Sequence, residues 1–421
     1  MRQRSQRGAI LVQVLVLVLG LVAITSIVAT TQRQTTDILV DRMQTLRADA
    51  AAQAGLNEGL ATLSSVNTNL VTMNDEWVQA GNQGQQLYEL PSANYRYQLI
   101  DASSLLDINT VTEETLTQLS LTNEQINSLL DWKDAATSTR SNGADNTFYG
   151  QLTSPYQKSS RPLRTLSELF LVNGWTPATL YSLPGELDAS PTGPSDIQGN
   201  TAGLRTLALR SLLVIDSGSM NTQSNGTQRI NVNQQIPTID GLTQLGLDRQ
   251  TALNLQRNAP WENFKALFQQ TALNTTQALI VLNAFGFTAD TRISGKINLN
   301  TTTQSVLELL PNMTTELITE IINRQTAGIS DIGELATFPN VTSGTLSLIA
   351  DYFTTGSDTF LVRSLGTAGS KSIALEAIVR ITNGVPQIMN IERVPSSLNA
   401  PQWWQWSSET SASTEVLGQT L

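Results

Sequence analysis

The sequence predicts a mixed α/β (α+β) protein in which a large helical insertion interrupts a domain made of one long helix and a small antiparallel sheet. An apolar segment at residues 9–30 continues into helical periodicity that reaches about residue 64. Strand-like runs lie at residues 94–102, 359–364, 372–381 and 387–394. Residues 104–355, between the first run and the others, carry short helix-like segments separated by turns. The strands on both sides of this insertion therefore belong to one domain, composed of residues 65–103 and 356–394.

The N-terminal segment has the length and charge distribution of a membrane-spanning helix. Residues 1–8 contain three arginines, whereas residues 9–30 are almost entirely apolar. At about 1.5 Å per residue, this apolar segment spans roughly 33 Å and crosses the hydrocarbon core of a bilayer. The positive-inside rule then predicts that residues 1–8 are cytoplasmic and that the chain after Thr30 is exported. A cleaved secretory signal is disfavoured, because its apolar region is only about 7–15 residues long.

The helix is expected to continue beyond the membrane. After Thr30 there is no glycine before Gly55 and no proline before Pro91. Apolar residues recur mostly in steps of three and four, at Leu39, Met43, Leu46, Ala50, Leu56, Leu60 and Leu63. This spacing is typical of an amphipathic helix. A plain membrane anchor would not need it, so we predict one helix from Ala9 to about Ser64, with residues 31–64 packed against the exported domain.

The short basic leader, Gly8 and the long helix resemble the N-terminus of type IV pilins. This resemblance implies that a prepilin peptidase cleaves between Gly8 and Ala9 and that Ala9 is then methylated. In most pilins the fifth mature residue is a glutamate that pairs with the N-terminal amine of a neighbouring subunit, and here this position is Gln13. One interpretation is drift at a lipid-facing position, where a carboxylate is costly. The other is a subunit that has no neighbour above it.

Composition excludes several kinds of chemistry. The chain of 421 residues contains neither cysteine nor histidine, so it lacks thiols, disulfides and the commonest general base. Its formal net charge of −10 is unfavourable for binding nucleic acid. Neither a Gly-x-Ser-x-Gly nor a Gly-x-Gly-x-x-Gly motif is present, and Gly295-Lys296 lacks the preceding glycine of a P-loop. We therefore predict a protein that is not an enzyme.

Four strands are expected to form the sheet. In residues 94–102, Tyr95, Tyr97 and Leu99 alternate with polar residues, as in a half-buried strand. The other three runs lie near the C-terminus, and Asn383-Gly384 separates the last two. Asn-Gly between two strand-like runs is a strong signal for a tight β-hairpin.

The insertion contains a repeated motif. Its copies are Leu106–Thr110, Ile230–Asn233 and Ile297–Asn300. Helix-like segments follow the first copy at 113–119, 123–132, 167–172 and 176–183, and the last copy at 303–310, 314–324, 331–336 and 345–351. The Asn or Thr that ends each motif is predicted to cap the next helix. The insertion is thus expected to be all-helical, with repeated bundles.

These bundles resemble sterile-alpha-motif-like or helix-hairpin-helix units, which raises DNA binding as an alternative function. Helix-hairpin-helix proteins approach a phosphate through a Gly-x-Gly turn. The corresponding turns here, at residues 119–122, 245–248 and 310–313, contain no such pair of glycines. We therefore interpret the bundles as a scaffold.

Residues 131–169 carry the most specific pattern in the chain. Asp131–Asp134, Gly143–Tyr149 and Arg161–Leu169 follow one another in that order. With the leader, Gln13 and the Ile297–Asn300 motif, they resemble the K class of minor pseudopilins of the type II secretion system. This resemblance implies a subunit at the tip of the periplasmic pseudopilus that initiates its assembly together with the I and J minor pseudopilins. It further implies contact with the assembly platform in the cell inner membrane.

The same region contains oxygen ligands of the kind that calcium prefers. The candidate ligands are Asp131, Asp134, Asn142, Asp145 and Asn146. The resemblance implies a calcium site here, with Asp134 and Asp145 as the main ligands. Two positions depart from the family pattern, because Ala136 replaces an acid and Asp145 replaces a glutamate. The alternative is a solvated polar loop in which Asp131 terminates a helix.

Two other functions stay open from the sequence. A type IV pilus minor pilin would share the leader and the tip position, although such pilins generally have small heads. A membrane-anchored receptor for DNA uptake would use the tandem bundles, although the negative charge opposes it. Residues 395–421 form a Ser- and Thr-rich segment with Trp403, Trp404 and Trp406. We expect a flexible tail, the alternative being an aromatic cluster that docks on a partner.

Overall fold

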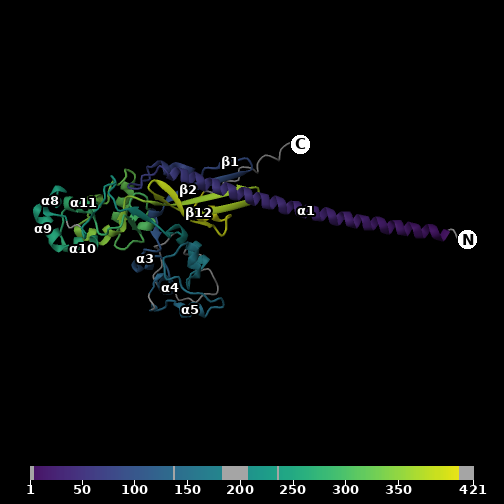
Figure 1. Ribbon diagram of the computed structural model, residues 1–421, viewed down its shortest axis with the longest axis horizontal. Coiled ribbons are helices and arrows are strands. Elements are labelled where there is room, and N and C mark those ends of the chain that lie inside the picture. Colours follow the sequence, from purple (N-terminus) through teal and green to yellow (C-terminus); the bar gives the residue numbers. More distant parts are fainter. Residues whose placement is uncertain (1–3, 136–137, 183–206, 235–236, 407–421) are drawn as a thin grey trace.

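Helix α1 (Arg4–Leu63) dominates the shape of the molecule. The computed structural model describes residues 4–135, 138–182, 207–234 and 237–406. The N-terminal half of α1 projects away from the rest of the chain, and its C-terminal half lies along the sheet (Figure 1). Within the described residues, it is the one helix that is long and apolar enough to cross a membrane. The prediction of a single helix up to about residue 64 is confirmed, since neither glycine nor proline interrupts the segment after Thr30 before Gly55.

The contact of α1 with the sheet begins later than predicted. Leu39, Met43 and Leu46 remain exposed, with Leu46 at 63%. Burial starts at Ala48, so the expected packing of residues 31–47 through their apolar side chains is wrong. The first polar contacts with the sheet are made by Asp41, which pairs with Lys371 at 2.6 Å.

Small residues allow α1 to approach the sheet closely. Ala48, Ala51 and Ala52 are fully buried. On the opposing strand, a Cβ at Gly366 would overlap the carbonyl oxygen of Ala48. Likewise, a Cβ at Gly55 of the helix would overlap the Ser364 side chain. The helix and the strand are therefore in near-backbone contact, and large apolar residues would not fit at this crossing.

The central sheet has the strand order β1-β2-β11-β12-β13, and all neighbouring strands are antiparallel. The strands are β1 (Tyr88–Leu90), β2 (Ala93–Asp101), β11 (Thr359–Ala368), β12 (Lys371–Thr382) and β13 (Val385–Arg393). The β12–β13 turn is Asn383-Gly384, with φ angles of 52° and 76°. These angles are those of a tight hairpin turn, so the hairpin prediction is confirmed. The four predicted strands are all present, and β1 adds a short edge strand.

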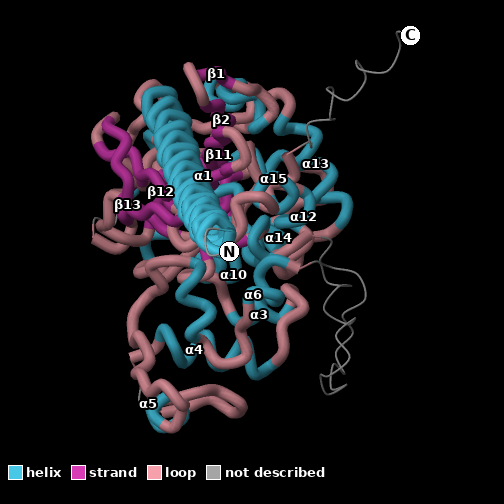
Figure 2. The backbone as a smooth tube through the Cα atoms, turned by 90° about the vertical axis from the view of Figure 1, so that its right-hand side faces the viewer, coloured by secondary structure: helices cyan, strands magenta, loops and turns pink. Residues whose placement is uncertain are grey.

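The two faces of the sheet are covered differently. Side chains such as Tyr97 and Val362 pack under α1, which lies across β2, β11 and β12 (Figure 2). Leu361 and Ile378 point to the other face and belong to the core of the insertion. The insertion thus forms a second layer on the face of the sheet opposite α1.

The insertion connects β2 to β11 and is mainly helical. Its helices are α3 (Glu113–Thr117), α4 (Asn123–Lys133), α5 (Asn146–Gly150), α6 (Pro177–Tyr181), α8 (Ile239–Gln244), α9 (Arg249–Asn258), α10 (Phe264–Gln270), α11 (Thr275–Ala284), α12 (Gln304–Leu307), α13 (Thr315–Gln325) and α14 (Ser343–Ile349). Short 3₁₀ helices lie at η2 (Ala102–Ser104), η3 (Leu166–Leu171), η4 (Leu209–Ser211), η5 (Ile332–Thr337) and η6 (Ala350–Tyr352), while α2 (Glu76–Gln79) and η1 (Ala80–Gly84) precede the sheet. Helices α8–α11 extend beyond the C-terminal end of α1, and α3–α5 form a separate projection (Figure 1).

Each repeated motif opens a unit that a short parallel strand pair closes. The pairs are β3 (Leu106–Asp107) with β4 (Leu213–Val214), β6 (Ile230–Asn231) with β7 (Phe285–Gly286), and β9 (Ile297–Asn298) with β10 (Phe353–Thr354). A further antiparallel pair joins β5 (Gly218–Met220) to β8 (Arg292–Ser294). The insertion therefore contains strands that the all-helical prediction omitted, and the motif residues form them.

The last asparagine of each motif forms hydrogen bonds with a later segment of the same unit. Asn109 accepts the N–H of Leu163, and Asn233 and Asn300 bind later segments of their units in the same way. Their amide groups also donate to backbone carbonyls there. The predicted capping role is therefore wrong for these residues. The three matching sets of contacts show that the motif is a structural repeat.

The start of the predicted flexible tail is folded against the sheet. Residues 395–406 include α15 (Ala400–Trp403), and the side chains of Trp404 and Trp406 are each 4% exposed. Trp404 Nε1 donates to Glu376 at 2.9 Å, and Trp406 Nε1 donates to Gln98 at 2.8 Å. The expectation of flexibility is wrong for this part, because buried indole N–H groups find acceptors on the sheet. Residues 407–421 lie outside the described residues.

Candidate functional site

The N-terminal part of α1 presents apolar side chains to its surroundings. The predicted cleavage positions Gly8 and Ala9 lie within the helix backbone, and Gln13 is exposed. Exposed apolar residues on this half include Leu11, Leu15, Val18, Leu21, Val22 and Ile27. Such a surface is stable in lipid or against other apolar helices. Cleavage after Gly8, methylation of Ala9 and the assembly role of Gln13 stay predictions.

The predicted calcium loop starts at the end of α4. A capping box formed by Thr122 and Gln125 fixes the start of this helix, and Lys133 is its last residue. Asp131 lies in the last turn with 2% of its surface exposed. The guanidinium of Arg140 donates to Asp131 Oδ1 at 2.7 Å, and the Arg140 backbone N–H donates to Oδ2 at 3.1 Å. The buried carboxylate is therefore paired with a cation from the same loop.

Asp134 shares this cation and lies beside a second one. Its Oδ2 is 3.5 Å from the Arg140 guanidinium, and its side chain is 38% exposed. The ammonium of Lys158 donates to the backbone carbonyls of Asp131 and Asp134, at 3.1 and 2.9 Å. These carbonyls lie at the C-terminal end of α4, where a helix favours positive charge.

The remaining predicted ligands have other tasks. Asp145 is the N-cap of α5 and accepts the backbone N–H groups of Thr147 and Phe148 at 2.9 and 3.0 Å. These bonds lower the pKa of Asp145, that from Phe148 most strongly. Asn146 Oδ1 accepts the Lys158 N–H at 2.9 Å. Asn142 is exposed and adopts a φ of 60° in the turn before Gly143.

The five predicted ligands therefore do not form one coordination shell in the structure. Across the part of the chain that the structure describes, no group of three or more His, Cys, Asp or Glu residues could hold a metal ion. Ala136, where the family pattern has another acid, lies outside the described residues. The sequence analysis did not identify Arg140 and Lys158, the two cations that contact the predicted ligands in the folded chain. Binding of calcium stays a prediction.

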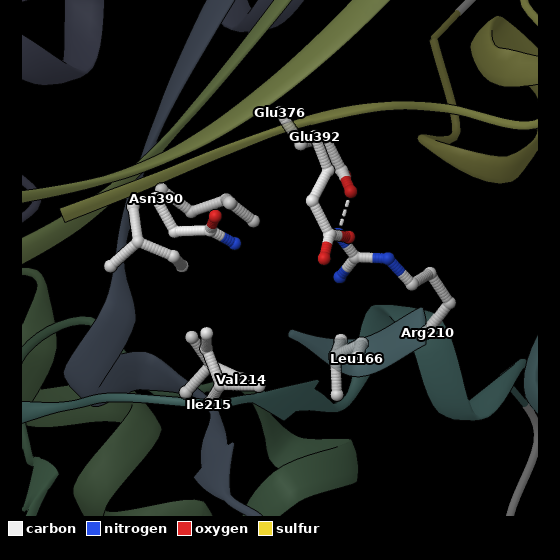
Figure 3. Close-up of a pocket in the computed structure, with 9 residues that line it drawn as sticks. Leu166, Arg210, Val214, Ile215, Glu376, Asn390 and Glu392 are labelled. Atoms are coloured by element: carbon white, nitrogen blue, oxygen red, sulfur yellow. Dashed lines mark ion pairs between the residues drawn. The ribbon is translucent and has the colours of Figure 1, made fainter. Parts of the chain in front are cut away.

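A second polar cluster joins the insertion to the sheet. Arg210, which follows Leu209 in η4, forms an ion pair with Glu376 of β12 (Figure 3). Arg363 of β11 donates to the same carboxylate at 2.9 Å, and Trp404 donates to it as well. Burial lowers the pKa of Arg363 well below its ordinary value, and the nearby Arg210 contributes. One buried carboxylate thus connects the insertion, the sheet and the C-terminal segment.

The region of the predicted calcium loop matches a known protein family. Residues 116–185 match the family described as type II secretion system (T2SS), protein K, and this range includes α4, α5 and Arg140. A chain in the crystal structure of the GspK-GspI-GspJ complex from the enterotoxigenic Escherichia coli type 2 secretion system is similar, with 14% identity and a TM-score of 0.47. The alignment covers 86% of this chain and 100% of that chain. No curated protein sequence matches the chain significantly.

The fold and the matched region point to the same class of protein. A long apolar helix packed on a small antiparallel sheet is the architecture of a pilin-like subunit, as the resemblance implied. Residues 116–185 match the type II secretion system protein K family, and this match supports a protein K-like minor pseudopilin. A type IV pilus minor pilin and a DNA receptor are not favoured.

Proposed function

We propose that this chain is the tip subunit of the periplasmic pseudopilus and initiates its assembly together with the I and J minor pseudopilins. In this proposal a prepilin peptidase removes residues 1–8, and the apolar half of α1 anchors the subunit in the cell inner membrane at the assembly platform. The N-terminus is cytoplasmic and the bulk of the chain is periplasmic. The chain has no catalytic role.

The observation that carries the proposal is the distribution of mass along α1. Helices α8–α11 extend past the C-terminal end of α1, away from the membrane-spanning half (Figure 1). In a filament whose subunits pack through parallel α1 helices, this mass would occupy the space in which a further subunit sits above. At the tip that space is open. Gln13 fits the same position, because a subunit without a neighbour above it needs no glutamate to pair with an N-terminal amine.

Complementation of a secretion-deficient strain tests the proposal. Gly8→Leu should leave the leader uncleaved and abolish secretion, and so should deletion of residues 9–30. Gly20→Ala is the matched control, because a Cβ at Gly20 meets no atom within 4 Å. Gln13→Ala should retain secretion, since the proposed position needs no charge there. Secretion that persists without residues 9–30 would contradict the proposal, and so would loss of secretion in Gln13→Ala.

A further inference from the structure

The Asp131 carboxylate is enclosed by groups of its own loop. Arg140 contacts both of its oxygens, one through the guanidinium at 2.7 Å and the other through the backbone N–H at 3.1 Å. A Cβ at Gly143 would overlap Asp131 Oδ2, so the backbone of this glycine also lies against the carboxylate. The Gly143 N–H donates to the Arg140 carbonyl at 2.9 Å and closes the turn. The side of the carboxylate that faces the loop is therefore filled.

The charges of the cluster are balanced without a metal ion. Asp131 and Asp134 contribute two negative charges, and Arg140 and Lys158 contribute two positive ones within hydrogen-bond distance of these two residues. A calcium ion bound to an Asp131 oxygen at 2.3–2.6 Å would lie beside the guanidinium, and like charges repel. Lys158 occupies the main-chain oxygens that a hard cation could otherwise take.

The third predicted carboxylate, Asp145, caps helix α5 and lies outside the Asp131 cluster. Asp145 Oδ1 accepts both N–H groups at the start of α5, and Oδ2 accepts the Thr139 hydroxyl at 3.1 Å. To move to the Asp131 cluster, Asp145 would have to break these hydrogen bonds and leave the first N–H groups of α5 without their cap. In the part of the chain that the structure describes, none of the three predicted carboxylates lacks a hydrogen-bond donor, so they do not form a free carboxylate pair for a metal ion.

We propose that Arg140, assisted by Lys158, takes the place of a structural metal ion in this loop, so that the fold around Asp131 does not depend on calcium. A guanidinium provides several donors in one plane and can join two carboxylates, as an ion would. The turn at residues 140–143 holds it in place. This inference concerns the loop alone and does not rest on the position of the chain in the pseudopilus.

Thermal unfolding of the full-length protein in detergent tests the inference. The wild type is expected to have the same melting temperature and the same protease resistance in excess EDTA and in millimolar calcium chloride. Arg140→Gln should melt about 2–6 °C lower, because it leaves the Asp131 carboxylate buried without its partner. The matched control is Arg161→Gln, whose partner Glu168 is 3.9 Å away and whose side chain is 44% exposed. It should melt close to the wild type.

Two results would overturn the inference. One is an increase in the melting temperature or protease resistance of the wild type on adding calcium. A ligand that binds the folded state and not the unfolded state stabilises the fold, so such an increase would mean that calcium binds. The other is an Arg140→Gln variant that melts like Arg161→Gln. If Arg140→Gln fails to fold, the calcium titration of the wild type still tests whether the fold depends on calcium, because it needs no variant. Isothermal titration of the wild type with calcium, which should give no heat of binding, provides the same decision independently.

Discussion

Replacement of Glu376 by glutamine should loosen the attachment of the insertion to the sheet. Glu376 is 6% exposed and accepts from Arg210 of the insertion, Arg363 of β11 and Trp404 of the C-terminal segment. Glutamine keeps the size and one acceptor oxygen, so the variant removes the charge and creates no cavity. Two buried guanidinium groups then lose their shared counter-charge.

The expected loss follows from the burial of the pair. Removing one partner of a buried ion pair costs about 3–5 kcal/mol, and the lower end applies because Glu392 stays near Arg210. For a chain of this size, that corresponds to a melting temperature roughly 3–6 °C lower. Thermal unfolding of the full-length protein in detergent, followed by tryptophan fluorescence, measures the change, since Trp404 lies at the carboxylate.

The chain offers a matched control in Glu320→Gln. Glu320 pairs with Arg324 one turn further along α13 at 2.6 Å, but both side chains are about one-third exposed. Such a pair contributes only about 0.5 kcal/mol, so this variant should melt within about 1 °C of the wild type. If Glu376→Gln melts at the same temperature as Glu320→Gln, the reasoning about the buried carboxylate is refuted.

Three further predictions concern different parts of the fold. Gly366→Val should force α1 away from β11 and lower the melting temperature, whereas Gly150→Ala, with open space around it, should not; equal melting of the two would contradict the close crossing. Trp404→Ala should lose about 3–5 kcal/mol in chemical unfolding, because it empties a buried site on the sheet; an unchanged midpoint would mean that the C-terminal segment adds no stability. Burial raises the pKa of Asp107 to about 6, so the folded state binds more protons than the unfolded state between pH 4 and 6, and stability falls as the pH rises through this range. Asp107→Asn should reduce this slope, and an identical slope in both proteins would show that another group causes it.

The sequence predicted the elements whose signals are local. The long helix follows from the absence of breaking residues between Thr30 and Gly55. The Asn383-Gly384 hairpin follows from a residue pair that readily adopts the positive φ angles of its turn. The repeat followed from three similar motifs, although their asparagines fasten whole units and do not cap helices.

The sequence could not predict the contacts that depend on distant segments. Arg210 and Glu376 meet only because the insertion folds back onto the sheet. The buried face of α1 is set by the close approach of Gly366, so its alanines matter more than Leu39 or Leu46. Arg140 lies inside the predicted loop, yet its pairing with Asp131 depends on a turn that the charge pattern alone does not specify.

In the proposed function, this chain forms a tip complex with the I and J minor pseudopilins. The most direct measurement is affinity co-purification of the full-length chain with I- and J-class subunits from detergent-solubilised membranes, with and without EDTA. A stable ternary complex is expected, and it should be retained in EDTA because the Arg140 loop needs no metal ion. Absence of any complex under both conditions would contradict the proposed function. A complex that dissociates in EDTA would contradict only the inference about Arg140.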